Sequence, residues 1–145
     1  MKITICSSIV FASKILEVKA QLEKMGHEVL IPCTTEHGAA NPDKNINEDL
    51  EFCFQNDVMM DHFKKIESSE AILVLNYPKN NINGYIGGSV LMETGLAYYL
   101  GKKIFLLYDF PDEKELKYSL EVKLTKPIIL YGDLNKINEH LNTNL

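Results

Sequence analysis

Short apolar runs alternate with helical patterns along the whole sequence, and this order restricts the fold more than any other feature. The run AILVLNY at residues 71–77 is almost continuously apolar, which is typical of a strand buried on both faces of a parallel sheet. Similar runs predict strands at 2–6, 28–32, 103–109 and 127–133. Apolar residues at helical spacing predict helices at 13–25, at 47–66, after residue 88 and near 133–141. We therefore expect one doubly wound α/β domain over residues 1–145, with a five-stranded parallel sheet.

In doubly wound sheets of the flavodoxin or Rossmann type, ligands bind outside the carboxyl ends of the strands, where the strand order reverses. This rule directs attention to the loops that follow the first four predicted strands. Those loops are 6–12, 33–45, 76–89 and 108–112.

Composition excludes several classes of function. The net charge of −5 argues against binding a nucleic-acid polymer, and every basic residue is lysine. No apolar run approaches the ~20 residues that span a bilayer, so we expect no membrane partner. The three cysteines form no CxxC pair and no signal-peptide pattern precedes the first strand, which together favour a reduced, cytoplasmic protein.

The sequence also predicts no cofactor and no metal ion. The loop after the first strand, CSSI, lacks the GxGxxG spacing of a dinucleotide site. The four histidines have no metal-ligand spacing, and no serine lies in a nucleophile elbow.

Glu93 is the strongest candidate for a functional residue. It lies in GGSVLMETG, where Ser89 is a plausible N-cap and Glu93 would be the fourth helical residue. An acid near a helix start is common because it complements the helix dipole. However, Val90, Ala97 and Leu100 share its stripe, and that stripe should face the sheet. A carboxylate at the mouth of a parallel sheet could instead be aimed at a ligand.

The loops after the first two strands offer weaker candidates. Ser7 and Ser8 could bind an anion or a sugar hydroxyl, or could cap the following helix. Glu36 and His37 could contact a base or sugar, or could be solvated loop side chains.

Asp57 and Asp61 lie four residues apart, and thus on one face of the long helix predicted at 47–66. They could form a solvated helix edge with Lys64 and Lys65 nearby. Alternatively, one of the two carboxylates could reach the site from this neighbouring helix.

Together these stretches resemble a known family. The ordered set CSSI, TEH, EAILVLNY and METGLAYYLGKKIFLL, over about residues 2–110, resembles the nucleoside 2-deoxyribosyltransferase superfamily. That superfamily includes the 2'-deoxynucleoside 5'-monophosphate N-glycosidases. The resemblance implies that Glu93 attacks the anomeric carbon of the sugar and forms a glycosyl ester. Water then hydrolyses this ester, or a second base accepts the sugar. It also implies that Asp61 or Asp57 assists the leaving base.

The resemblance extends to substrate binding. Ser8 matches the serine of the family's GSI turn, Ser7 replaces its glycine, and Ser89 lies near its phosphate loop. Thr4 stands where the family has a tyrosine, for which Tyr85 could serve instead, and GGSVLME replaces the family's SxGxGxE loop. The choice between nucleoside and nucleotide therefore stays open. The expected substrate-binding residues are Ser7, Ser8, Ile9, His37, Tyr85, Gly87, Gly88 and Ser89.

The leading hypothesis is an N-glycosidase or N-deoxyribosyltransferase that acts on a small-molecule nucleoside or its 5'-monophosphate. An enzyme that hydrolyses NAD at its N-glycosidic bond is a related alternative. A non-catalytic nucleotide-binding or sensor domain would use the same loops without turnover. The apolar stripes on two sides of the predicted long helix, and the family resemblance, favour a homodimer or larger homo-oligomer.

Overall fold

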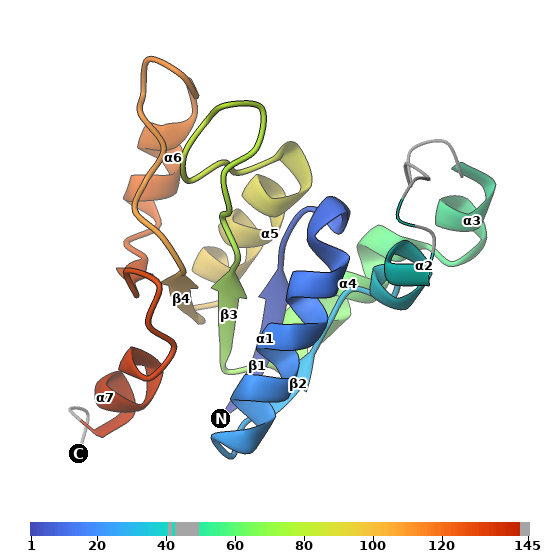
Figure 1. The fold of residues 1–145 in the computed structure, drawn as a ribbon, viewed down its shortest axis with the longest axis horizontal. Helices are drawn as coiled ribbons and strands as arrows, with labels where there is room; N and C mark the ends of the chain where they lie inside the picture. Colours follow the sequence, from blue (N-terminus) through green and yellow to red (C-terminus); the bar gives the residue numbers. More distant parts are fainter. Residues whose placement is uncertain (41, 43–49, 143–145) are drawn as a thin grey trace.

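The computed structural model describes residues 1–40, 42 and 50–142 and confirms the α/β class. Its five strands form one all-parallel sheet in the order β2-β1-β3-β4-β5 (Figure 1). The strands are β1 (Lys2–Cys6), β2 (Glu28–Leu30), β3 (Ala71–Val74), β4 (Lys103–Leu106) and β5 (Ile128–Ile129).

Helices cover both faces of the sheet, as a doubly wound fold requires. The helices α1 (Ala12–Lys24) and α7 (Lys136–Asn142) pack on one face. The other face carries α4 (Val58–Ser68), α5 (Gly88–Tyr99) and α6 (Ser119–Leu124). Figure 1 views the molecule with α1 on the near side and α5 on the far side.

Side chains alternate between the two faces along each strand, because successive residues of a strand point in opposite directions. In β1, Ile3 and Ile5 join the core under α1, whereas Cys6 joins the core under α4 and α5. In β4, Phe105 belongs to the first core and Leu106 to the second. Two separate apolar cores therefore hold the sheet in place.

The strand order reverses at β1, which lies between β2 and β3. Cys6, the last residue of β1, is paired with Val74, the last residue of β3. The chain leaves β1 toward β2 on one side and enters β3 on the other. The carboxyl ends of β1 and β3 therefore form the mouth at which this fold class binds ligands.

The single long helix predicted at 47–66 is wrong. Within the described residues the segment forms α3 (Leu50–Gln55) and α4, separated by a break at Asn56 and Asp57. Asp57 has φ 41°, a left-handed conformation, and its side chain accepts a hydrogen bond from the Met60 N–H at 3.3 Å. It is the N-cap of a new helix, so Asp57 and Asp61 do not share the face of a continuous helix. Residues 47–49 lie outside the described part of the chain.

Other boundaries differ from the predicted ones. The strands β2 to β5 end earlier than their apolar runs, because a strand ends where its residues no longer pair with an adjacent strand. The strand β5, for example, pairs with β4 at two positions, Phe105 with Ile128 and Leu106 with Ile129. The segment 33–45, expected to be loop, contains α2 (Thr35–Ala40). A short 3-10 helix, η1 (Ile9–Phe11), precedes α1.

The apolar stripes that suggested an oligomer are partly exposed. Phe54 on α3 is 79% exposed, and Met59 and Met60 on α4 are also exposed. In the described part of the chain, no helix is long and apolar enough to cross a membrane.

Candidate active site

Two side chains, the half-buried Ser7 and the buried Asn76, hold the strand ends at the mouth together by hydrogen bonds. The Ser7 hydroxyl donates to the Leu75 carbonyl at 3.0 Å and so ties the end of β1 to the end of β3. The Asn76 amide donates to the carbonyls of Tyr108 and Asp109 and accepts from the Tyr108 N–H at 2.8 Å. The three central strands therefore end in a fixed arrangement.

A cation reaches this mouth from the loop after β3. The Lys79 ammonium donates to the Ser8 hydroxyl at 3.1 Å and lies 5.4 Å from the centre of the Tyr85 ring. Ser8 precedes η1, but its hydroxyl makes no capping hydrogen bond there. Ser8, Lys79 and Tyr85 thus form a polar group at the edge where a ligand would enter.

The loop that carries Tyr85 depends on a glycine. Gly84 has φ +70°, and a Cβ at this position would lie 2.4 Å from the Asp109 carbonyl oxygen. Only glycine fits such a close approach of two backbones in this conformation. The backbone at Gly84 is therefore packed tightly against the loop after β4.

Glu93 lies on the inner side of α5. The helix begins at Gly88 with Gly87 as its N-cap, so Ser89 is not the cap and Glu93 is the sixth helical residue rather than the fourth. Val90 and Ala97 on the same stripe are buried, as predicted, and the Glu93 side chain is 14% exposed. Glu93 is thus too far from the helix start to act mainly as a complement to its dipole.

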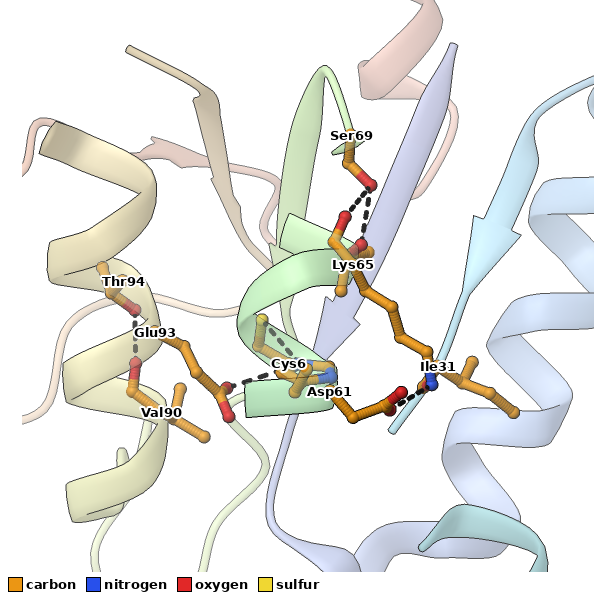
Figure 2. A network of polar contacts seen from close by, with 10 residues as sticks. Cys6, Ile31, Asp61, Lys65, Ser69, Val90, Glu93 and Thr94 are labelled. Carbon is orange, nitrogen blue, oxygen red and sulfur yellow. Dashed lines mark hydrogen bonds and ion pairs between the residues drawn. The ribbon is translucent and has the colours of Figure 1, made fainter. Parts of the chain in front are cut away.

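The Glu93 carboxyl meets two buried side chains from other elements. Its Oε2 lies 3.7 Å from Nε2 of His62 on α4, and the same nitrogen lies 3.5 Å from the Cys6 Sγ at the end of β1. Figure 2 shows Glu93 extending from α5 toward Cys6. We call Cys6, His62 and Glu93 the buried polar cluster; it joins β1, α4 and α5 directly below the mouth.

Burial controls the charge of this cluster. Loss of water raises the pKa of Glu93 to about 7, opposed in part by a hydrogen bond with the Cys6 thiol. Burial lowers the pKa of His62 to about 4, with a smaller contribution from the charge of Lys65. Burial, and then the charge of Glu93, raise the pKa of Cys6 well above its usual range. At neutral pH the cluster therefore contains a neutral imidazole, a thiol and a carboxyl that titrates near neutrality.

Two polar atoms of the cluster have no hydrogen-bond partner among the described residues: Glu93 Oε2 and His62 Nδ1. By contrast, the neighbouring buried hydroxyl of Thr94 donates to the Val90 carbonyl at 2.7 Å. An unsatisfied buried polar group costs roughly 1–3 kcal/mol of folding free energy. The fold therefore tolerates a cost at Glu93 and His62 that it avoids at Thr94.

The structure places the two candidate helper acids away from Glu93. Asp61 pairs with Lys65 at 2.7 Å, and Lys65 also donates to the Ile31 carbonyl just beyond β2. In Figure 2, Asp61 points toward Lys65 and Ile31, whereas Glu93 approaches Cys6 from the other side. The pKa of Asp61 is lowered, mainly by the hydrogen bond from Lys65. The exposed Asp57 caps α4.

The remaining predicted residues surround the mouth at varied depths. Ile9 begins η1 and packs against Gly38 of α2, and His37 is half-buried on the same helix. Gly87 is half-buried, whereas Gly88 and Ser89 are exposed at the start of α5.

Sequence reasoning missed Cys6, His62 and Lys79. In the sequence, Cys6 only ends a predicted strand and begins the CSSI loop, and His62 has no metal-ligand spacing, because the residues that it contacts are distant in the chain. Lys79 had a usable signal: in a chain whose cations are all lysines, a lysine in the loop after the central strand is a candidate anion contact.

No family model matches this chain, and a search of curated proteins finds no match to it.

Proposed function

We propose that this protein cleaves the N-glycosidic bond of a nucleoside or nucleoside 5'-monophosphate, with Glu93 as the reacting carboxylate. One observation carries the proposal: Glu93 is held by α5 below the mouth between β1 and β3, where doubly wound folds bind ligands. The resemblance of the sequence motifs to the deoxyribosyltransferase superfamily supports the same assignment.

The proposed reaction has two steps. A carboxylate oxygen of Glu93 attacks the anomeric carbon, the bond from that carbon to the base nitrogen breaks with its electron pair going to the nitrogen, and the base takes a proton from water. Water then hydrolyses the glycosyl ester, or a second base accepts the sugar. Asp61, which lies in the first turn of α4 and is kept ionised by its pairing with Lys65, is proposed to orient the leaving base rather than to protonate it, whereas Asp57 is engaged as a cap.

The mouth also suggests how a substrate is oriented. Ser8 and Lys79 present a hydroxyl and an ammonium to the entering ligand, and Tyr85 offers a ring beside them. An ammonium with a hydroxyl suits a phosphate oxygen, so the 5'-monophosphate is the preferred form of the substrate.

A panel assay tests the proposed function. The protein is incubated with purine and pyrimidine nucleosides, their 2'-deoxy forms, the corresponding 5'-monophosphates and NAD, and free base or nicotinamide is measured by chromatography. We expect base release from at least one monophosphate, and its loss in Glu93→Gln. Glu113→Gln, which changes an exposed glutamate paired with Lys123, is the matched control. Release that persists undiminished in Glu93→Gln would overturn the role of Glu93.

A non-catalytic nucleotide-binding domain is the second candidate. The observation in its favour is the deep burial of the Glu93 side chain, which leaves little of the carboxyl open to a sugar. This alternative predicts calorimetric binding of a nucleotide with no base released after long incubation at high protein concentration.

A further inference from the structure

We propose that Cys6, His62 and Glu93 form a binding site for a transition-metal ion, with Zn²⁺ as the best-matched ion. The thiol sulfur, an imidazole nitrogen and a carboxylate oxygen of these residues all lie within 4.8 Å of one another. Each residue comes from a different element, β1, α4 or α5, so the whole fold holds the three donor atoms together.

The spacing of the donors fits tetrahedral coordination. With metal–sulfur bonds of ~2.3 Å and metal–nitrogen or metal–oxygen bonds of ~2.0 Å, tetrahedral ligand atoms lie roughly 3.3–3.6 Å apart. The observed separations are 3.5 Å from Cys6 Sγ to His62 Nε2 and 3.7 Å from His62 Nε2 to Glu93 Oε2. Two of the three separations therefore lie within a few tenths of an ångström of tetrahedral values, and the third, between the Cys6 sulfur and the Glu93 carboxylate, is within 4.8 Å.

The chemistry of the donors selects the ion. A thiolate and an imidazole favour Zn²⁺ and similar ions over Mg²⁺ or Ca²⁺, which require a shell of oxygen atoms. On binding, the Cys6 thiol loses its proton to solvent and the neutral imidazole of His62 offers its Nε2 lone pair. Three protein ligands leave a fourth position for water or a ligand, as in catalytic rather than structural zinc sites.

The unpartnered carboxylate oxygen is independent support for this site. Glu93 Oε2 is buried, faces His62 Nε2 and has no hydrogen-bond partner among the described residues. By comparison, the buried hydroxyls of Thr4 and Ser69 satisfy each other at 2.7 Å. A cation between the three donors would satisfy this unpaired oxygen.

The site has a consequence for activity, which rests on the function proposed above. A carboxylate held by a metal ion is not free to attack a sugar. Bound Zn²⁺ would therefore inhibit base release, and a chelator would restore it. Metal binding itself is measured without any reference to turnover.

Titration with Co²⁺ tests the site directly, because a cobalt–thiolate bond gives a charge-transfer band in the near ultraviolet. After dialysis against a chelator, we expect the wild-type protein to develop this band at one Co²⁺ per chain and to lose it when Zn²⁺ is added. Cys6→Ser should abolish the band, and Glu93→Gln should weaken cobalt binding by about 100-fold or more, since even an outer-shell partner is worth 10–100-fold. Cys33→Ser, which removes an exposed thiol, is the matched control and should keep the band.

A second readout protects the test against a variant that does not fold. Zn²⁺ should raise the melting temperature of the wild type and of Cys33→Ser, but not that of Glu93→Gln. No charge-transfer band in the wild type, or a band that survives in Cys6→Ser, would overturn the site. Base release without a metal site would leave the proposed function standing, and a metal site without base release would leave the site standing.

Discussion

The two faces of the sheet differ in how they treat buried polar groups. Under α1 and α7 the core is built around apolar residues such as Phe105 and Leu22; the buried His27 bonds Asn138 of α7 through Nε2 at 2.9 Å, and its Nδ1 has no partner among the described residues. Under α4 and α5 the same sheet carries Cys6 beside His62 and Glu93, with two polar atoms lacking partners among the described residues. The second face thus gathers three buried polar side chains at one place, and clusters of titratable groups with shifted pKa values often mark functional sites.

The groove on the surface does not lie over the polar face of the sheet. A groove of about 440 Å³ lies on the apolar side, between α1 and the segment leading into α7, and is lined by Lys14, Glu17, Tyr77, Tyr108 and Asp133 among others. The buried polar cluster of Cys6, His62 and Glu93 lies across the sheet from it. The buried polar cluster and the groove therefore lie on opposite sides of the sheet, and we assign the candidate active site to the cluster.

The largest expected effect is a loss of stability when the core under α1 is disrupted. Phe105→Ala removes a fully buried ring from the core under α1 and should lower the free energy of unfolding by about 3–5 kcal/mol. Chemical denaturation measures this change. Tyr99→Ala, at an 86% exposed position, should change stability by less than about 0.5 kcal/mol. Equal losses in the two variants would show that Phe105 is not a core residue.

On the face under α4 and α5, we expect removal of a buried side chain's charge to increase stability rather than to lower it. Glu93→Met replaces a buried carboxyl by an apolar chain of similar length and should raise the free energy of unfolding by about 1–2 kcal/mol, while ending any catalysis. The measurement is made with a chelator present. Glu121→Met on the exposed side of α6 is the control and should be nearly neutral. A clear loss of stability in Glu93→Met would mean that the carboxyl is satisfied after all.

A substitution of Lys79 tests whether the mouth of the sheet binds the phosphate of the substrate. Lys79→Met keeps the aliphatic stem but removes the ammonium that reaches Ser8. KM for a 5'-monophosphate should rise about 10-fold, with little change for the nucleoside, because the lost contact is charge-assisted. Lys117→Met, at an exposed position, is the control. An equal rise in KM for both substrates would place Lys79 away from the phosphate.

The smallest effect concerns the acid that caps α4. Asp57→Ala should cost about 1 kcal/mol of stability through loss of the cap, whereas Asp57→Asn should keep most of it. Neither change should alter kcat. A large fall in kcat in both variants, without loss of stability, would return Asp57 to the list of catalytic residues.

The sequence was sufficient for the fold class because alternating periods of apolar residues leave few topologies open. It was also sufficient for the burial of Glu93, since Val90 and Ala97 mark the inner stripe of α5. The roles assigned to these residues stay predictions.

The missed features depend on local backbone choice or on distant contacts. The break between α3 and α4 uses Asn56 and Asp57, residue types that favour caps and left-handed backbone; the apolar spacing continued across them and concealed it. The partnership of Cys6 with His62 joins residues 56 positions apart, and no local pattern records it.

The role of Glu93 as the reacting carboxylate is tested most directly by looking for a sugar attached to the Glu93 side chain. The protein is incubated with a slowly turned over 2'-fluoro nucleoside or its 5'-monophosphate, quenched in acid and analysed by mass spectrometry after digestion. We expect a glycosyl ester on the peptide that contains Glu93, and none in Glu93→Gln. A sugar adduct on a different peptide, or base release that continues unchanged in Glu93→Gln, would contradict it.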